Sequence, residues 1–174
     1  MPTRERTDVA IIGAGIAGLT LASRIMQKDA GLKVSVIGPE DNRNQRLSFW
    51  IDKKNAGNYQ PFITHQWHTW SFNHSRSGHA SHRACHQSYV SLDAKLYKKN
   101  LRKQLFATGC HLQSASVTSI DIERANNVVY MGDEAITAAT VIDTRAPCIP
   151  ETTLKQQFWG SVVDLPRPHG LAAP

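Results

Sequence analysis

The sequence predicts an α/β fold that begins with a strand, a helix and a second strand. Residues 8–12 form a short apolar run that leads directly into glycines, which is typical of a buried parallel strand. Residues 16–28 carry apolar and small side chains at helical spacing, and residues 33–37 return to a strand-like pattern. The three segments follow one another closely enough to form one βαβ unit.

A glycine-rich turn joins the first strand to the helix. The turn has the spacing G-x-G-x-x-G and reads Gly13, Ala14, Gly15, Ile16, Ala17 and Gly18. The first glycine permits the tight turn, the second lets the backbone approach a diphosphate, and the third allows close packing of helix and strand. Free N–H groups at the helix N-terminus favour the negative charge of that diphosphate. Because strand, helix and second strand surround the motif, we predict a dinucleotide site rather than a coincidental glycine turn.

Two acidic residues are candidate cofactor ligands outside the glycine turn. The acid that usually binds the adenosine ribose should end the second strand, but Gly38 stands there. Glu40 follows two residues later, and it is either the ribose ligand or a solvated loop carboxylate. Residues 138–145 read as a late strand ending at Asp143, a feature that favours FAD over NAD. The alternative for Asp143 is an acid in the turn after a buried strand.

The rest of the chain predicts a mixture of strands and one further helix. Residues 93–106 form this helix, because Tyr97, Leu101 and Leu105 share one face, and Gly109 ends it. Residues 71–86 are rich in Ser, His and Arg and predict an exposed hairpin or loop. The other predicted segments are a polar loop at 41–46, an aromatic-rich region extending to residue 72, and strands at 87–91, 111–117, 119–123, 128–131 and 135–143.

Composition is that of an ordinary globular protein with a basic balance. Lys and Arg number 20 against 14 Asp and Glu, and the net charge is +6. This charge is compatible with anionic lipid, nucleic acid or an acidic substrate, and equally with an ordinary basic enzyme. Cys85, Cys110 and Cys148 are an odd set without pairing spacing, which favours reduced thiols. With no predicted signal peptide or membrane span, we expect a cytoplasmic protein, and peripheral membrane association stays open.

A histidine-rich string has the residue types of a metal site. His79, His82, Cys85 and His86 follow the spacing H-x-x-H-x-x-C-H. Interleaved Ser and Arg favour a solvated loop, so no metal site is predicted. The lysines of the helix at 93–106 predict a solvated or lipid-facing surface rather than a nucleic-acid interface.

Several blocks along nearly the whole chain resemble the bacterial lycopene β-cyclase family. Gln45 and Leu47 replace the family's histidine and tryptophan within the first of these blocks, and Ala146 replaces the family's glycine directly after Arg145. The matching blocks, in chain order, are residues 44–49, 61–67, 89–105, 141–145, 157–160 and 168–171.

The resemblance implies a glutathione-reductase-type flavoprotein fold. A Rossmann-like FAD-binding domain with inserted strands would occupy residues 1–150, and a β-rich substrate domain would begin at 151–174. The implied activity is that of an intramolecular lyase or isomerase, which cyclises the ψ-end of lycopene to a β-ring without net redox change. The family implies reduced FAD as cofactor, a carotenoid substrate, and NAD(P)H as a candidate reductant.

The resemblance does not supply a catalytic residue. In the family, the proton donor is attributed to a carboxylate-rich motif in the second half, and no such run occurs here. Glu123, Glu134, Glu151 and Asp164 are isolated and read as surface carboxylates, so the catalytic acid is unknown. We therefore expect a truncated cyclase-like chain. The alternatives are another flavin-dependent oxidoreductase, such as a monooxygenase or isoprenoid reductase, and a non-catalytic remnant.

Overall fold

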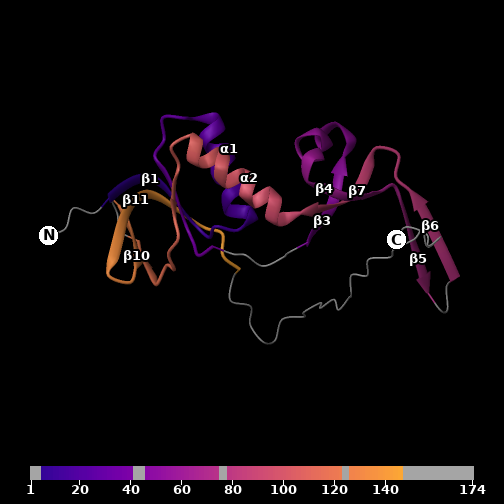
Figure 1. Cartoon of the computed structure of the whole chain (residues 1–174). Coiled ribbons are helices and arrows are strands. Elements are labelled where there is room, and N and C mark those ends of the chain that lie inside the picture. Colours follow the sequence, from indigo (N-terminus) through magenta and orange to yellow (C-terminus); the bar gives the residue numbers. More distant parts are fainter. Residues whose placement is uncertain (1–4, 41–45, 75–77, 123–125, 147–174) are drawn as a thin grey trace. The chain divides into compact units, whose positions relative to one another are not determined.

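The computed structural model describes residues 5–40, 46–74, 78–122 and 126–146 (Figure 1). The chain divides into two compact units. Unit 1 comprises Met1–Leu47 and Leu92–Arg145, and unit 2 comprises Ser48–Ser91 and Ala146–Pro174. The predicted domain boundary at residue 150 lies outside the described residues, so it stays a prediction.

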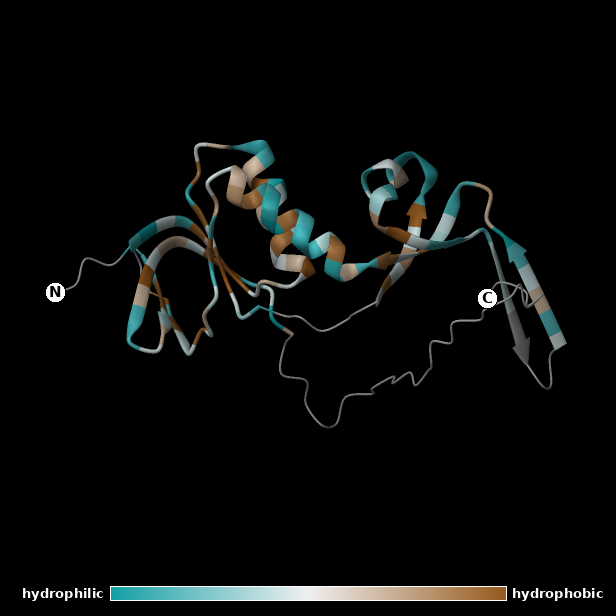
Figure 2. Ribbon diagram, viewed as in Figure 1, coloured by the Kyte–Doolittle hydropathy of each residue, from teal (hydrophilic) through white to brown (hydrophobic). Residues whose placement is uncertain are grey.

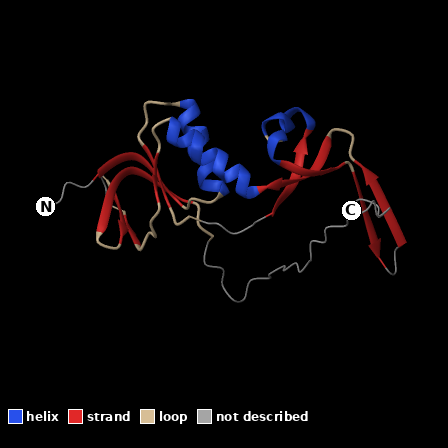
Figure 3. Cartoon of the chain, viewed as in Figure 1, coloured by secondary structure: helices blue, strands red, loops and turns tan. Residues whose placement is uncertain are grey.

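Unit 1 is built on a six-stranded sheet in the order β8-β2-β1-β11-β10-β9. Figure 3 shows the strands in red and the helices in blue. Neighbouring strands from β8 to β11 pair in parallel, and β10 pairs with β11 and β9 in the antiparallel sense. The bounds are β1 (Glu5–Ile12), β2 (Val34–Ile37), β8 (His111–Gln113), β9 (Ser119–Asp121), β10 (Asn127–Met131) and β11 (Glu134–Asp143). The α/β prediction is confirmed, including the first βαβ unit.

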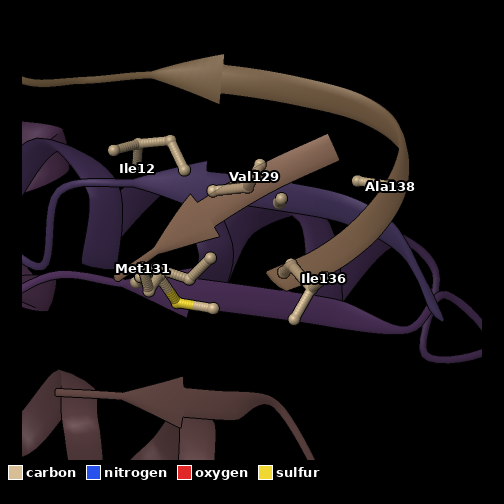
Figure 4. Close-up of a cluster of buried hydrophobic side chains, with 7 residues drawn as sticks. Ile12, Val129, Met131, Ile136 and Ala138 are labelled. Atoms are coloured by element: carbon tan, nitrogen blue, oxygen red, sulfur yellow. The ribbon is translucent and has the colours of Figure 1, made fainter. Parts of the chain in front are cut away.

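The core of unit 1 surrounds β1. Ala10, Ile11 and Ile12 are consecutive and at most 1% exposed, so this strand is buried on both faces, as expected in a parallel sheet. Ile12 also joins an apolar cluster with β10 and β11 (Figure 4). The labelled members of that cluster are Ile12, Val129, Met131, Ile136 and Ala138.

Two helices, α1 (Ile16–Lys28) and α2 (Ala94–Ala107), pack against each other within unit 1. In α2 the predicted apolar face of Tyr97, Leu101 and Leu105 is buried, and Figure 2 shows apolar and polar residues alternating around the helix. The Asp93 carboxylate begins α2 by accepting a hydrogen bond from the Leu96 N–H at 2.9 Å. No helix in the described ranges combines the length and apolarity needed to span a bilayer.

The predicted strand at 111–117 is shorter in the structure and ends at Gln113. The reason is its partner: Ile37, the last residue of β2, pairs with Gln113, and Gly38 then donates its N–H to the Gln113 carbonyl at 3.0 Å. With no further strand beside it, the chain turns away.

Unit 2 holds a three-stranded sheet in the order β3-β7-β4 and a separate hairpin of β5 and β6. The hairpin, β5 (Thr69–His74) with β6 (Gly78–Arg83), confirms the expectation for residues 71–86. Its Cα register pairs Trp70 with His82. The remaining bounds are β3 (Arg46–Asp52), β4 (Ile63–Trp67), β7 (Gln87–Asp93) and the 3₁₀ turns η1 (Lys53–Asn58) and η2 (Gln60–Phe62).

Candidate functional site

The glycine turn lies at the carboxyl end of β1, where β1 adjoins β11. Gly13 has a φ of 107°, in the left-handed region that favours glycine, and its N–H donates to the Ile37 carbonyl at 2.7 Å. A Cβ built on Gly13 would lie 2.6 Å from Thr144 Oγ1. Both backbone conformation and space therefore require glycine at this position.

Gly18 is required by packing between α1 and the end of β1. A Cβ on this residue would overlap the carbonyl oxygen of Gly13 and would lie 3.0 Å from Thr144 Oγ1. The role predicted for the third glycine, close approach of helix and strand, matches this geometry.

Gly15 differs from the other two glycines of the motif, because neither packing nor backbone conformation in the ligand-free chain requires a glycine at this position. A Cβ built there meets no atom within 4 Å, and its φ of −79° suits any residue. Gly15 is the N-cap of α1, yet no side chain caps the helix, and the first turn contains no acid. The first N–H groups of an α-helix have no intrahelical acceptor. The structure thus has open space at Gly15 directly beside the N–H donors of the first turn of α1, which no side chain caps. An anionic ligand could bind in this space and accept hydrogen bonds from these donors.

The lack of space at Gly38 explains why no acidic residue directly follows β2. A Cβ on Gly38 would lie 2.5 Å from the Ala14 nitrogen, so any side chain there would clash with the glycine turn. The next acid, Glu40, has a side chain that is 63% exposed, and its Oε1 lies 3.8 Å from Arg102 Nη1. The structure therefore places Glu40 beside Arg102 of α2, and its role as ribose ligand stays a prediction.

Asp143 ends β11 directly beside the glycine turn, because its Cα pairs in register with Ile12 of β1. Its carboxylate accepts hydrogen bonds from Arg145 Nε at 3.0 Å and Nη2 at 2.8 Å. These bonds to Arg145 lower the pKa of Asp143. Arg145 in turn donates from Nη1 to the Val117 carbonyl at 3.2 Å, so the pair fixes the end of β11.

Thr144 is a site residue that sequence reasoning missed. Its Oγ1 lies 2.8 Å from the Ile12 carbonyl oxygen and 3.3 Å from that of Gly13, and its N–H donates to the Ile12 carbonyl at 2.8 Å. The hydroxyl therefore holds the start of the glycine turn against the end of β11. The only sequence signal was the position of Thr144 within the block at 141–145.

The strand order of the sheet creates a topological switch point at the carboxyl ends of β1 and β11. From β1 the chain passes through α1 to β2 on one side, whereas β11 adds to the other side. In open α/β sheets, ligands bind at the carboxyl ends of strands where the order reverses. The glycine turn and Asp143 meet at this place.

The other candidate residues are not brought together into a site. Within the described residues, no three His, Cys, Asp or Glu side chains gather as a metal centre; His82 instead packs beside Trp70, with ring centroids 5.9 Å apart. Glu134 accepts a hydrogen bond from Gln113 Nε2 at 3.2 Å. Glu123, Glu151 and Asp164 lie outside the described residues.

The chain matches one known protein family over nearly its whole length. Residues 8–174 match the family described as "Lycopene cyclase protein". The chain belongs to the lycopene cyclase family. No curated protein sequence shows significant similarity to this family member.

Solved structures with the same fold include a flavoprotein/dehydrogenase and a halogenase that has been solved with FAD. Halogenase PltM superposes with a TM-score of 0.63 at 15% identity, over 83% of this chain and 36% of the halogenase. A flavoprotein/dehydrogenase from Cytophaga hutchinsonii gives a TM-score of 0.56 at 20% identity, over 80% of this chain and 39% of that protein. A geranylgeranyl bacteriochlorophyll reductase-like protein from Thermoplasma acidophilum gives 0.58 at 20% identity, over 81% and 39%. This lycopene cyclase family member thus spans less than two fifths of each of these proteins.

Proposed function

We propose that this chain binds FAD through the glycine turn, with the diphosphate over the N-terminus of α1. The observation that carries the proposal is Gly15: it leaves open space directly at an uncapped helix N-terminus. Gly13 and Gly18 shape the turn, and the exposed Ala17 lies in the first helical turn. The FAD-containing structure of halogenase PltM, which shares this fold with a TM-score of 0.59, supports FAD as the dinucleotide.

Glu40 and Asp143 would act at the two ends of this site. Glu40 follows β2, the strand after which the adenosine ribose binds in such units. Asp143 lies beside Ile12 at the end of β1 and is held as a carboxylate by Arg145. We propose Glu40 as the ribose ligand and Asp143 as a polar boundary of the diphosphate region.

The proposed reaction is cyclisation of the ψ-end of a carotenoid to a β-ring without net redox change, and family membership supports it. When bound, reduced FAD would supply negative charge that stabilises a developing carbocation. The residues of this chain would hold the diphosphate and fix the cofactor beside the carboxyl edge of the sheet. NAD(P)H is the proposed source of the reducing electrons.

The first experiment measures FAD binding and then lycopene conversion. The purified chain should take up FAD, with the flavin spectrum as readout, and Gly15→Ala should weaken FAD affinity about a hundredfold, or about 2.7 kcal/mol. The thermal midpoint of free Gly15→Ala should match that of the parent, because the free chain has room for the methyl group. Gly57→Ala is the matched control, since a Cβ on Gly57 also meets nothing within 4 Å.

Three results would count against this function. A chain that fails to take up FAD lacks the proposed site. Equal FAD affinity in Gly15→Ala and the parent would place the diphosphate elsewhere. If FAD binds but flavin is oxidised and reduced stoichiometrically with substrate turnover, the chain is a redox enzyme rather than a cyclase.

We also propose that α2 contacts an anionic membrane surface, where an apolar carotenoid would be found. The helix contains no acid, and its exposed residues include Lys95, Lys99 and Lys103 together with Phe106, which is 79% exposed. Basic residues attract anionic lipid, and an exposed aromatic ring inserts into the interface.

Vesicle flotation tests the membrane proposal. Binding to phosphatidylglycerol vesicles should exceed binding to phosphatidylcholine vesicles, and Phe106→Ser should weaken it severalfold. Ile122→Ser is the control, because Ile122 is 87% exposed but lies outside α2. Equal binding of the two vesicle types, or equal losses in the two variants, would contradict the proposal.

A further inference from the structure

Unit 2 contains a hollow of ≈ 650 Å³ that the glycine-turn site does not use. It is lined by residues from β3, the β5-β6 hairpin and β7 together with the segment that joins the hairpin to β7. Small-molecule sites in proteins typically measure about 300–1,000 Å³. The hollow therefore has room for a compact organic group.

Aromatic rings form much of this lining. Trp50 packs against Tyr89 with ring centroids 5.3 Å apart, and Trp70 packs beside His82 at 5.9 Å. Both tryptophans are still 42% exposed despite these contacts. Large aromatic surfaces gathered around one concavity and left open to water mark a place where an apolar group binds.

The polar groups of the lining favour a ligand without charge. Among the described residues, the lining contains no carboxylate, ammonium or guanidinium group, and its polar members are neutral side chains such as Ser71 and Gln87 beside His82. The lining therefore offers a phosphate or carboxylate no Lys or Arg side chain as a partner. A branched, unsaturated hydrocarbon instead gains dispersion contacts with the ring faces.

We propose that this hollow binds the acyclic isoprenoid end group of the carotenoid. The inference rests on the cyclase function proposed above, which supplies a neutral, branched, unsaturated substrate. Trp50, Trp70 and Tyr89 form the apolar walls, and the volume suits an end group rather than the full length of the polyene. The hollow is thus a specificity site for the end that is to be cyclised.

Calorimetric titration with pseudoionone, a short ketone that carries the acyclic isoprenoid end, tests this binding directly. The chain should bind pseudoionone saturably and about tenfold more tightly than a straight-chain saturated methyl ketone of the same chain length. Trp70→Ala, which removes a wall, and Ser71→Phe, which fills the hollow, should each weaken pseudoionone binding about tenfold or more. Asn55→Phe and Gly57→Ala, at exposed residues of η1 outside the lining, should leave it within about twofold.

FAD uptake separates failure of this inference from failure of the proposed function. The wall and filling variants should keep the parent's FAD affinity, because the glycine turn lies in unit 1. Absence of saturable pseudoionone binding, equal binding of the saturated ketone, or undiminished binding in Ser71→Phe would each overturn the inference. If pseudoionone binding fails while FAD uptake and lycopene conversion persist, the hollow alone is wrong and the cyclase function stands.

Discussion

Unit 1 has an apolar core formed by one sheet and its two helices, whereas unit 2 gathers half-exposed aromatic residues around one hollow. In unit 1, Ile11 and Leu19 are 0% exposed, and the cofactor candidates lie at one edge of the sheet. In unit 2, Trp50 and Trp70 are each 42% exposed around a hollow. The contrast supports different proposed roles for the two units: the backbone geometry of unit 1 suits an anionic cofactor, and the side-chain surface of unit 2 suits an apolar substrate.

The largest effect is expected at the most crowded glycine of unit 1. Gly18→Ala would force α1 away from the Gly13 carbonyl, and we expect unfolding free energy to fall by about 3 kcal/mol or more. Urea unfolding of the free chain measures this loss. Gly57→Ala in unit 2, where a Cβ has open space, should change stability by less than about 0.5 kcal/mol. Equal behaviour of the two variants would remove the packing argument for Gly18.

A smaller effect is expected at the contact between β11 and the glycine turn. Thr144→Val keeps the side-chain shape but removes the hydroxyl that contacts the Ile12 and Gly13 carbonyls. We expect unfolding free energy to fall by about 1–2 kcal/mol, and FAD affinity to fall with it. Thr144→Ser keeps the hydroxyl and should retain most of the FAD affinity. If Thr144→Val keeps the parent's stability and FAD affinity, the contact between the Thr144 hydroxyl and the two carbonyls contributes to neither property.

Unit 2 contains a comparable polar contact, and its loss should lower stability without changing the affinity for FAD. Ser88 is 1% exposed, and its hydroxyl accepts a hydrogen bond from Gln66 Nε2 and contacts His68 Nδ1, both at 3.0 Å. We expect Ser88→Ala to cost about 1 kcal/mol, because both exposed partners can bond to water instead. FAD affinity, measured alongside, should stay at the parent's value. A loss of FAD binding in Ser88→Ala would contradict the proposal that unit 1 alone binds FAD.

The smallest effect concerns the exposed ion pair of Asp143 and Arg145. Arg145 lowers the pKa of Asp143 in the folded chain, so the pair's stabilisation is complete above the unfolded pKa and is lost as pH falls through the lower folded pKa. Because both side chains are at least 40% exposed, we expect less than about 1 kcal/mol at neutral pH. Unfolding of Asp143→Asn should differ from the parent at pH 7 and converge with it in acid below about pH 4. Asp121→Asn, at an exposed acid on β9, should show no such convergence.

Local pattern was sufficient for β1, α1 and α2 of unit 1, but not for the end of the strand predicted at 111–117. The glycine spacing and the apolar run before it located β1, the turn and α1, and the spacing of Tyr97, Leu101 and Leu105 located α2. Short-range periodicity determines these features, because a helix or strand buries one regularly spaced set of side chains. The hairpin of unit 2 was recognised only as a hairpin or loop, since its residues are polar and exposed and carry little periodic signal.

The sequence by itself determined the βαβ unit, the dinucleotide motif and the family resemblance. Only the tertiary structure decided why glycine stands at position 38, where a side chain would meet Ala14, and why Thr144 matters, through a contact with Gly13 across 131 residues. Tertiary structure likewise brought Trp50, Trp70 and Tyr89 around one hollow. The physical reason is the same in each case: these contacts join residues that are distant in sequence, and no local spacing encodes which of them meet.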